Sequence, residues 1–193
     1  MGVSRQQAAE NRSAIVAAAE RLFRARGVDA VGLTELMKEA GFTQGGFYNH
    51  FKSKDALVAA IMEKAMQDRA DAPADSPQRQ VERYLSARHR DDVAAGCPLA
   101  GFAGDAPRLG AAARECYAGG LATYLDRFAE RVAAQRGATP ESRRDAIAAF
   151  SQMVGTLLLS RAIANADPAL ADEILDAGRR SLADALDRPS TPA

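Results

Sequence analysis

The segment formed by residues 33–57 (LTELMKEAGFTQGGFYNHFKSKDAL) constrains the fold more than any other part of the 193-residue chain. It contains two short helical stretches joined by a tight turn, followed by a lysine-containing stretch that opens a further helix. Four apolar residues of the first stretch recur at the spacing of one helix face: Leu33, Leu36, Met37 and Ala40. A helix with this face buried is therefore predicted over residues 34–40. The arrangement predicts a helix-turn-helix, whose second helix enters a DNA groove while the first packs behind it.

The second helix of the pair, predicted over residues 44–51, begins with two glycines. Gly41 is expected to end the preceding helix in the left-handed conformation, and Thr43 to cap the next one. Gly45 and Gly46 should together destabilise a helix by roughly 2 kcal/mol relative to alanine. Such a cost at an exposed helix start indicates that another molecule approaches the backbone closely. A phosphate is one candidate, because free N–H groups and the helix dipole favour an anion there.

Polar side chains of the kind that bind phosphates and base edges cluster around this helix. Phe47 and Phe51, four residues apart, are expected to face the core and to leave the polar residues outside. The cluster comprises Thr43, Gln44, Tyr48, Asn49, His50, Lys52 and Lys54. Any one of them is equally well explained as a solvated residue of a small helical domain, whereas the whole set favours contact with DNA.

Residues 27–57 resemble the DNA-binding domain of the TetR/AcrR family of bacterial transcriptional repressors. The resemblance is carried by three stretches, GLTELMKEAG, FTQGGFYNHF and KSKDAL. The positions that match the family signature are Gly45, Gly46, Phe47, Tyr48, Asn49, His50, Phe51, Lys54 and Asp55. Gly32 departs from the family, which more often has Ser or Thr at this place. Glycine is an acceptable N-cap, but it offers no side-chain hydrogen bond.

The resemblance implies that Thr34 touches a phosphate and that six residues of the cluster lie along the DNA: Thr43, Gln44, Tyr48, Asn49, His50 and Lys54. Together with the paired glycines and Lys52, the predicted DNA-binding set is Thr34, Thr43, Gln44, Gly45, Gly46, Tyr48, Asn49, His50, Lys52 and Lys54. Arg5 and Arg12, on the preceding helix, are expected to be solvated rather than bound to the DNA backbone.

Composition and charge agree with a small DNA-binding head on a larger helical body. Apolar residues make up 47% of the chain but aromatic residues only 6%, which favours helix packing over a sheet sandwich. Residues 1–54 hold eight Lys and Arg against five Asp and Glu, a net charge of +3, and the rest carries 17 against 20, a net charge of −3. The zero total therefore hides a basic head and an acidic body. The predicted domains are residues 1–54, which bind DNA, and residues 55–193, which bind ligand and dimerise.

The fold class predicted from these patterns is all-α, with about nine helices, the first three forming the helix-turn-helix domain. Beyond the segment already described, helices are predicted over residues 7–26, from 54 to at least 65, and over 77–89, 106–136, 139–165 and 167–186. Two stretches are predicted as loops, residues 71–77 and the Gly- and Pro-rich residues 97–105. Gly119 and Gly120 are expected either to kink the long helix or to let another element come close to it.

The sequence gives little support to an enzyme or a membrane protein. No stretch is expected to be long and apolar enough to span a membrane, and a signal peptide is not recognised, so a cytoplasmic location is expected. The chain has two histidines, His50 and His89, without metal-ligand spacing, and no phosphate loop or GxSxG motif. No catalytic residue, metal site or cofactor is therefore predicted. An all-α ligand-binding enzyme and a non-specific DNA-coating protein stay open as alternatives.

The last two predicted helices are expected to form the dimer. The first of them is apolar nearly all round, so it must be covered on several sides. In the resembling family this pair forms a four-helix bundle with the same pair of a second subunit. A two-fold dimer also places two recognition helices in successive major grooves about 34–36 Å apart.

In the resembling family the body encloses a small-molecule pocket. Candidate lining residues are Cys97, Phe102, Tyr117, Tyr124, Phe128 and Met153, although an aromatic stripe at helical spacing is more often plain core. The resemblance predicts a repressor released from a near-palindromic operator by a small-molecule inducer.

The two cysteines, Cys97 and Cys116, are expected to be free thiols in a reducing compartment. Cys97 lies between Gly96 and Pro98, where it is either exposed near a helix start that lowers its pKa or a small buried hydrophobe. Some members of the resembling family with a cysteine after a glycine at this place sense electrophiles or oxidants. A thiol switch at Cys97 is therefore the alternative to a small-molecule inducer.

Overall fold

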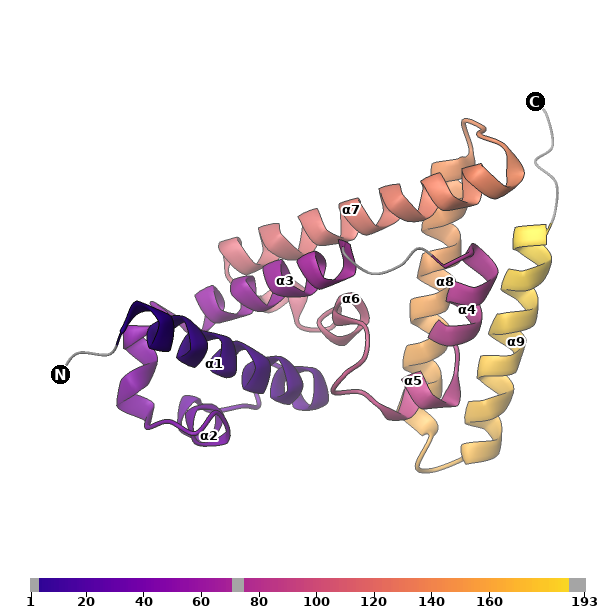
Figure 1. The fold of residues 1–193 in the computed structure, drawn as a ribbon. Helices are drawn as coiled ribbons and strands as arrows, with labels where there is room; N and C mark the ends of the chain where they lie inside the picture. The colour runs from indigo at the N-terminus through magenta and orange to yellow at the C-terminus, as the bar shows by residue number, and fades with distance from the viewer. Residues whose placement is uncertain (1–3, 71–74, 188–193) are drawn as a thin grey trace. The chain divides into compact units, whose positions relative to one another are not determined.

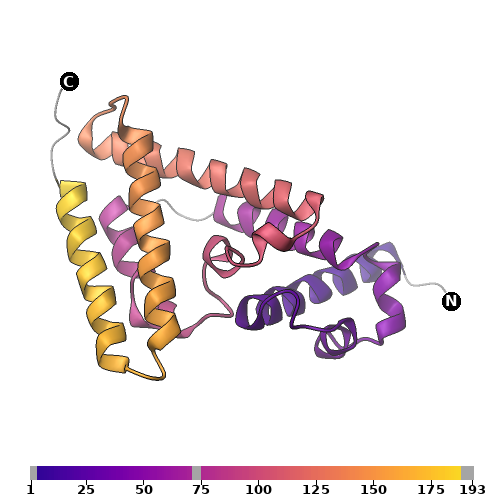
Figure 2. The same ribbon diagram turned by 180° about the vertical axis from the view of Figure 1, so that it is seen from behind.

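The computed structural model describes residues 4–70 and 75–187, and this part of the chain is helical throughout (Figures 1 and 2). The predicted all-α fold is thus confirmed. The elements are α1 Arg5–Arg26, α2 Leu33–Glu39, the 3₁₀ helix η1 Gln44–Asn49, α3 Lys54–Ala70, α4 Pro77–Tyr84, α5 Ala87–Asp91, α6 Pro98–Gly101, the 3₁₀ helix η2 Ala106–Arg108, α7 Ala111–Arg136, α8 Ser142–Ile163 and α9 Pro168–Asp187. Four residues of the loop predicted at 71–77, residues 71–74, lie outside the described residues.

The chain forms two compact units. The first unit comprises residues 1–72 and 93–120, and the second comprises residues 73–92 and 121–193. The helix α7 begins in the first unit and ends in the second. The functional boundary predicted after Lys54 stays a prediction, since these units are defined by contacts within the chain.

The core of the first unit joins α1, α2, η1 and α3. Its largest fully buried side chains include Phe23, Phe47, Phe102, Ile15, Leu36, Met37, Leu57, Ile61 and Met62. The beginning of α7 lies beside α3 in both views (Figures 1 and 2). It contributes Ala113 to this core, with Cys116 and Tyr117 packed at its edge.

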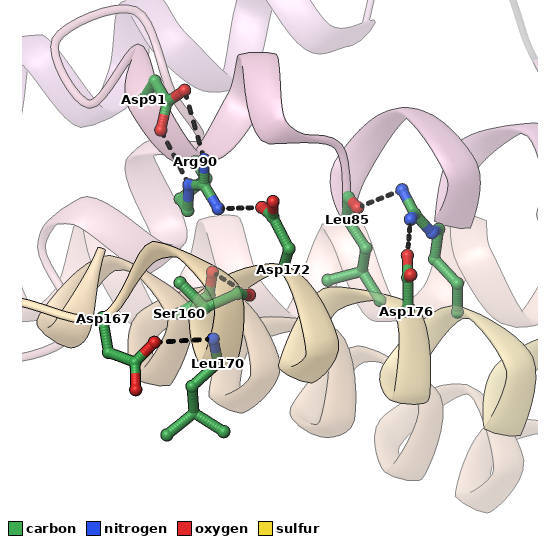
Figure 3. A network of polar contacts seen from close by, with 10 residues as sticks. Leu85, Arg90, Asp91, Ser160, Asp167, Leu170, Asp172 and Asp176 are labelled. Atoms are coloured by element: carbon green, nitrogen blue, oxygen red, sulfur yellow. Dashed lines mark hydrogen bonds and ion pairs between the residues drawn. The ribbon is translucent and has the colours of Figure 1, made fainter. Parts of the chain in front are cut away.

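Local capping chemistry sets most of the helix ends. Ser4 and Ser53 accept hydrogen bonds from the backbone N–H groups of the residues three positions later, at the starts of α1 and α3. Gly27 and Gly41, with φ of +86° and +85°, follow the last turns of α1 and α2 in the left-handed conformation. Asp167 caps α9, because its carboxylate accepts a hydrogen bond from the N–H of Leu170 (3.0 Å, Figure 3).

The second helix of the pair is a 3₁₀ helix rather than the α-helix expected over residues 44–51. The N–H of Gly46 donates to the carbonyl of Thr43, and that of His50 donates to the carbonyl of Phe47, both three residues earlier. A short stretch with two glycines at its start has low α-helix propensity, and 3₁₀ turns are common in such short pieces.

Three other helix boundaries differ from the predictions. The helix expected over residues 77–89 is two helices, because α4 ends at Tyr84 and Ser86 caps α5 by accepting from the N–H of His89. The helix expected from 106 begins at Ala111, after η2, and the one expected from 139 begins at Ser142. A short helix, α6, lies within the predicted loop at 97–105. The long helix α7 runs unbroken through Gly119 and Gly120.

The second unit is built on the packing of α8 against α9, with α4 against both. The buried contacts come from Met153 and Leu157 of α8, Leu175 and Leu182 of α9, and Val81 of α4. Gly178 allows α8 and α9 to approach closely, since a Cβ there would lie 2.6 Å from the Cγ2 of Thr156. Nearby, the buried hydroxyl of Ser160 donates to the carbonyl of Ala171 (2.8 Å, Figure 3).

Arginines attach the short helix α5 to the same pair of helices. Arg90 forms ion pairs with Asp91 and with Asp172 of α9, and these hydrogen bonds raise the pKa of the guanidinium further above its ordinary value (Figure 3). Arg161 of α8 donates to the backbone carbonyls of His89 and Arg90 (2.6 and 3.1 Å). The break in the predicted helix at 77–89 is therefore held in place by residues remote in sequence.

One helix contradicts the expectation that no stretch would be long and apolar enough to span a membrane. By length and composition α8 meets that description, with a mean hydropathy of 1.4 over its most apolar window. The reason is the uncharged run between Asp145 and Arg161, rich in Ala and Leu. A single such helix is weak evidence for a membrane protein, because the central helix of a helical core has the same composition.

Candidate nucleic-acid interface

The helix η1 is fixed from behind by aromatic side chains and presents polar ones outward. Phe47 is fully buried and Phe51 nearly so, with ring centroids 5.8 Å apart. Tyr48, the next residue after Phe47, has 66% of its surface exposed and meets the Phe47 ring edge-on. The predicted division into core aromatics and outward polar residues is confirmed.

The structure brings the ten predicted DNA-binding residues together on α2, η1 and the start of α3. Seven of them are exposed: Thr34, Thr43, Gln44, Gly45, Tyr48, Asn49 and Lys52. The other three, Gly46, His50 and Lys54, are half-buried. The contact with DNA itself stays a prediction.

Three of these residues also form side-chain hydrogen bonds within the chain. The ammonium of Lys54 donates to the carbonyl of Val31 (2.7 Å) and lies 5.3 Å from the ring centroid of Phe23. The hydroxyl of Thr34 donates to the side-chain carbonyl of Gln44 (2.8 Å). Lys54 therefore contributes to the fold in addition to any contact that it makes with DNA. The Thr34 hydroxyl already donates its proton to Gln44.

Arg12 contacts the residues at the end of η1, which sequence reasoning missed. Its guanidinium donates to the carbonyl of His50 (2.9 Å), the residue that follows η1, and lies 4.1 Å from the ring centroid of Phe51. Arg12 is exposed, as expected, but its guanidinium also bonds to the end of η1. No local pattern could have shown this, because the two partners are 38 residues apart. Arg12 satisfies a carbonyl at the end of η1 and so helps to hold that helix against α1.

The paired glycines are not explained by the protein's own packing. Neither Gly45 nor Gly46 has a positive φ. A Cβ at Gly45 would meet nothing within 4 Å, and one at Gly46 would make an ordinary contact of 3.7 Å with Met37. The absence of side chains therefore leaves the backbone of the first turn of η1 open to an external molecule.

The six candidate ligand-lining residues divide between the two units. In the first unit, Phe102 is fully buried, Cys97 is 2% exposed, and the Tyr117 hydroxyl donates to the carbonyl of Leu99 (2.7 Å). Burial raises the pKa of Tyr117 above its ordinary value. Cys97 is the N-cap residue of α6 but makes no side-chain cap hydrogen bond. Of the two possibilities for Cys97, the structure favours the small buried hydrophobe over the exposed thiol.

In the second unit, Phe128 and Met153 are fully buried, while Tyr124 is half-buried with its ring 4.3 Å from that of Phe150. Sequence reasoning missed two polar partners of this group. Gln80 donates to the Tyr124 hydroxyl and accepts a hydrogen bond from Arg131 (2.8 Å). For Phe102, Phe128 and Met153, complete burial supports the plain-core alternative.

Residues 15–61 match the family model described as "Bacterial regulatory proteins, tetR family". The chain is also similar to the transcriptional regulator TtgR of Pseudomonas putida, with 40% identity over 60 residues, and to the transcriptional repressor BepR of Brucella suis, with 42% identity over 62 residues. Residues 15–61 therefore form a DNA-binding domain of the TetR/AcrR family of transcriptional regulators. This family consists of transcriptional regulators, not enzymes.

The similarity to TtgR covers 31% of this chain and 29% of TtgR, and the similarity to BepR covers 32% of this chain and 30% of BepR. The fold likeness extends further. A TetR regulator from Chloroflexus aurantiacus matches 95% of the chain, and 98% of its own, with a TM-score of 0.76 at 22% identity. The reduced form of Escherichia coli NemR matches 94% of the chain, and all of its own, with a TM-score of 0.69 at 19% identity. The TetR-like fold therefore continues through the body.

Proposed function

We propose that this TetR/AcrR protein is a homodimeric repressor that binds a near-palindromic operator and is released by a small-molecule inducer. The observation that carries the proposal is the arrangement around η1. Fully buried Phe47 and nearly buried Phe51 fix the helix, and Gln44, Tyr48 and Asn49 stand exposed on it. These side chains donate and accept hydrogen bonds, and Lys52 adds a positive charge beside them. Such a set can contact both phosphates and base edges.

The exposed apolar side chains support the dimer. Within the described residues, every large aliphatic side chain that is exposed lies on α8 or α9: Ile147, Leu158, Leu159 and Leu170. Ile147 and Leu158 are 11 residues apart, which is three helical turns, so they share one face of α8. A second copy of the same two helices would bury these side chains in an isologous interface. The apolar composition of α8 is then that of a helix covered on both sides.

Release of the operator requires that the inducer distinguish two forms of the dimer. We place its binding in the body, and we propose that its occupation shifts α3 and misaligns the two heads. A ligand changes such an equilibrium only by its difference in affinity for the two forms. The inducer must therefore bind the form that does not fit DNA more tightly than the form that does.

The DNA-binding part of the proposal is tested by measuring binding of the full chain to the DNA upstream of its own gene, over a range of salt concentrations. Affinity should fall steeply as salt rises, because Lys and Arg contacts release counterions from the phosphates. A scrambled duplex of the same length should bind much more weakly. Equal affinity for both duplexes would indicate a non-specific DNA-coating protein instead.

Variants locate the interface. Tyr48→Ala removes an exposed ring and should weaken operator binding roughly tenfold or more while the fold is kept, because a hydrogen bond to a charged group contributes about 1.5–3 kcal/mol. Lys52→Ala tests charge on the same surface more cleanly than Lys54→Ala, because Lys54 also bonds to Val31. Arg127→Ala, exposed on α7, is the charge-matched control. Loss of affinity in the control as large as in Lys52→Ala would contradict the placement of the interface.

A further inference from the structure

The side chain of Gln44, the first residue of η1, is held by the side chain of Thr34 on α2. The Thr34 hydroxyl donates to the Oε1 of Gln44 across 2.8 Å, and both residues are exposed. The two elements behind this contact are firmly packed, since Leu36 and Met37 of α2 and Phe47 of η1 are fully buried. The hydrogen bond therefore links two side chains whose backbones are already fixed relative to each other.

In the structure it is the carbonyl oxygen of the Gln44 amide, not its NH₂ group, that is directed to Thr34. The amide has a carbonyl oxygen and an NH₂ group on opposite sides of one carbon. With the oxygen directed to Thr34, the NH₂ group points away from α2 and offers only donors. A glutamine whose two ends are both available can instead bind adenine through N6 and N7 together.

We propose that Thr34 is a specificity-determining residue, because it turns Gln44 into a donor-only contact that selects acceptor-bearing base edges in the major groove. The proposal rests on the proposed function, in which η1 contacts operator bases. Guanine presents the acceptors N7 and O6, and thymine presents O4. Adenine presents an amino group beside its single acceptor N7, and cytosine presents an amino group, for which the fixed Gln44 amide has no acceptor. The base facing Gln44 should therefore be guanine or thymine rather than adenine.

The sequence offers a closely matched pair of variants for Thr34. Thr34→Val replaces the hydroxyl by a methyl group of similar size and the same branching, so it removes the bond and frees the amide to rotate. Thr34→Ser keeps the hydroxyl and should keep the restraint. Gln44→Ala removes the amide and thereby identifies the base pair that it contacts. Thr34→Ala serves as a second hydroxyl-free variant if the valine proves unfavourable near the start of α2.

The experiment is a selection by the full chain from a duplex library with about 25 random base pairs, long enough for two half-sites one helical turn apart. Wild type should enrich a near-palindromic sequence with guanine or thymine at the position whose preference disappears in Gln44→Ala. In Thr34→Val the preference for that base over adenine should fall by about fivefold or more, since a bidentate pair discriminates by about 1–3 kcal/mol. Thr34→Ser should select the same base as wild type.

Three results would overturn this role of Thr34. The first is that wild type selects adenine at the base position assigned to Gln44. The second is that both Thr34→Val and Thr34→Ala keep the wild-type base preference at that position. The third is that Gln44→Ala changes the base preference at no position of the operator. Each of them leaves a sequence-specific operator elsewhere in the selection, so the proposed function would stand. Failure of the wild type to enrich any sequence would overturn the proposed function itself, and this inference with it.

Discussion

The carboxylate of Asp105 accepts a hydrogen bond from the backbone N–H of Val28, 77 residues earlier in the chain (3.1 Å). The N–H belongs to the residue after Gly27, whose positive φ ends α1. Asp105 is buried and is also paired with Arg108 (2.9 Å). One side chain thus ties the segment around η2 to the end of α1 within the first unit. It also satisfies a polar group that the turn after α1 leaves without a helical partner.

The substitution Asp105→Ala should therefore destabilise the protein by about 1–3 kcal/mol, because it leaves a buried N–H without an acceptor. Urea unfolding followed by circular dichroism measures this directly. Asp29→Ala is the matched control, since Asp29 faces the same Arg108 at 3.5 Å but its side chain is 79% exposed. Asp29→Ala should lower the free energy of unfolding by less than about 0.5 kcal/mol, because exposed ion pairs contribute little. Equal losses in the two variants would show that the bond to Val28 contributes nothing.

The contrast between Gly45 and Gly41 gives a second prediction. Gly45→Ala should leave the protein as stable or up to about 1 kcal/mol more stable, because the backbone allows alanine and no atom lies within 4 Å of its Cβ. Operator affinity should nevertheless fall roughly tenfold, since the new methyl group holds the DNA backbone away from η1. Parallel thermal unfolding and operator titration of the same preparation separate the two effects.

Gly41→Ala should show the opposite pattern. Its φ of +85° is unfavourable for alanine, so the protein should lose about 1–2 kcal/mol of stability. The folded fraction should still bind operator with nearly wild-type affinity, since Gly41 belongs to the turn and not to the predicted contact set. Unchanged operator binding by Gly45→Ala would remove the case for close approach of a phosphate at the paired glycines.

Sequence information was sufficient where structure is determined by neighbouring residues. The ends of α1 and α2 and the start of α9 follow from Gly27, Gly41 and Asp167, each of which acts within four residues of its own position. The buried aromatic pair of η1 follows in the same way from a spacing of four. The all-helical fold and the exposed polar residues of η1 were predictable for this reason.

Sequence information was insufficient where the deciding contact is remote in the chain. Arg12 bonds to His50 across 38 residues, and Arg161 bonds to His89 across 72. The first contact makes a surface arginine part of the η1 site, and the second helps to hold the break between α4 and α5. Neither partner has a helix-period or capping pattern that marks it. A single sequence contains no other signal for such pairs.

Substitution of Leu158 tests the dimer. Leu158 is partly exposed on α8, on the face that also carries Ile147. Leu158→Arg should place two like charges in the interface and give a folded monomer by sedimentation velocity. Operator affinity should fall by about two orders of magnitude or more, because each head then binds its half-site without the other. Ala122→Arg, at an exposed position on α7, adds the same charge elsewhere and should stay dimeric. A dimer in both variants would exclude this face of α8.

The two cysteines give a last prediction, which separates a thiol switch from a small-molecule inducer. Cys97 is 2% exposed, and burial together with the negative charges of Glu63, Glu115 and Asp55 raises the pKa of Cys116. The thiolate is the reactive form, so both should react slowly with iodoacetamide at neutral pH. In Cys97→Ser, the alkylation rate of Cys116 should rise continuously from about pH 7 to about pH 10.

If neither thiol is a switch, treatment with a quinone or hypochlorite should release wild type and Cys97→Ser from the operator to the same extent. Cys116→Ser is the control for the second thiol, and anisotropy of a labelled duplex reports release. If oxidant releases wild type and Cys116→Ser but leaves Cys97→Ser bound, the thiol of Cys97 is the switch. In that case the buried position of Cys97 must open before reaction, and the rate of release should become independent of oxidant concentration once opening limits it.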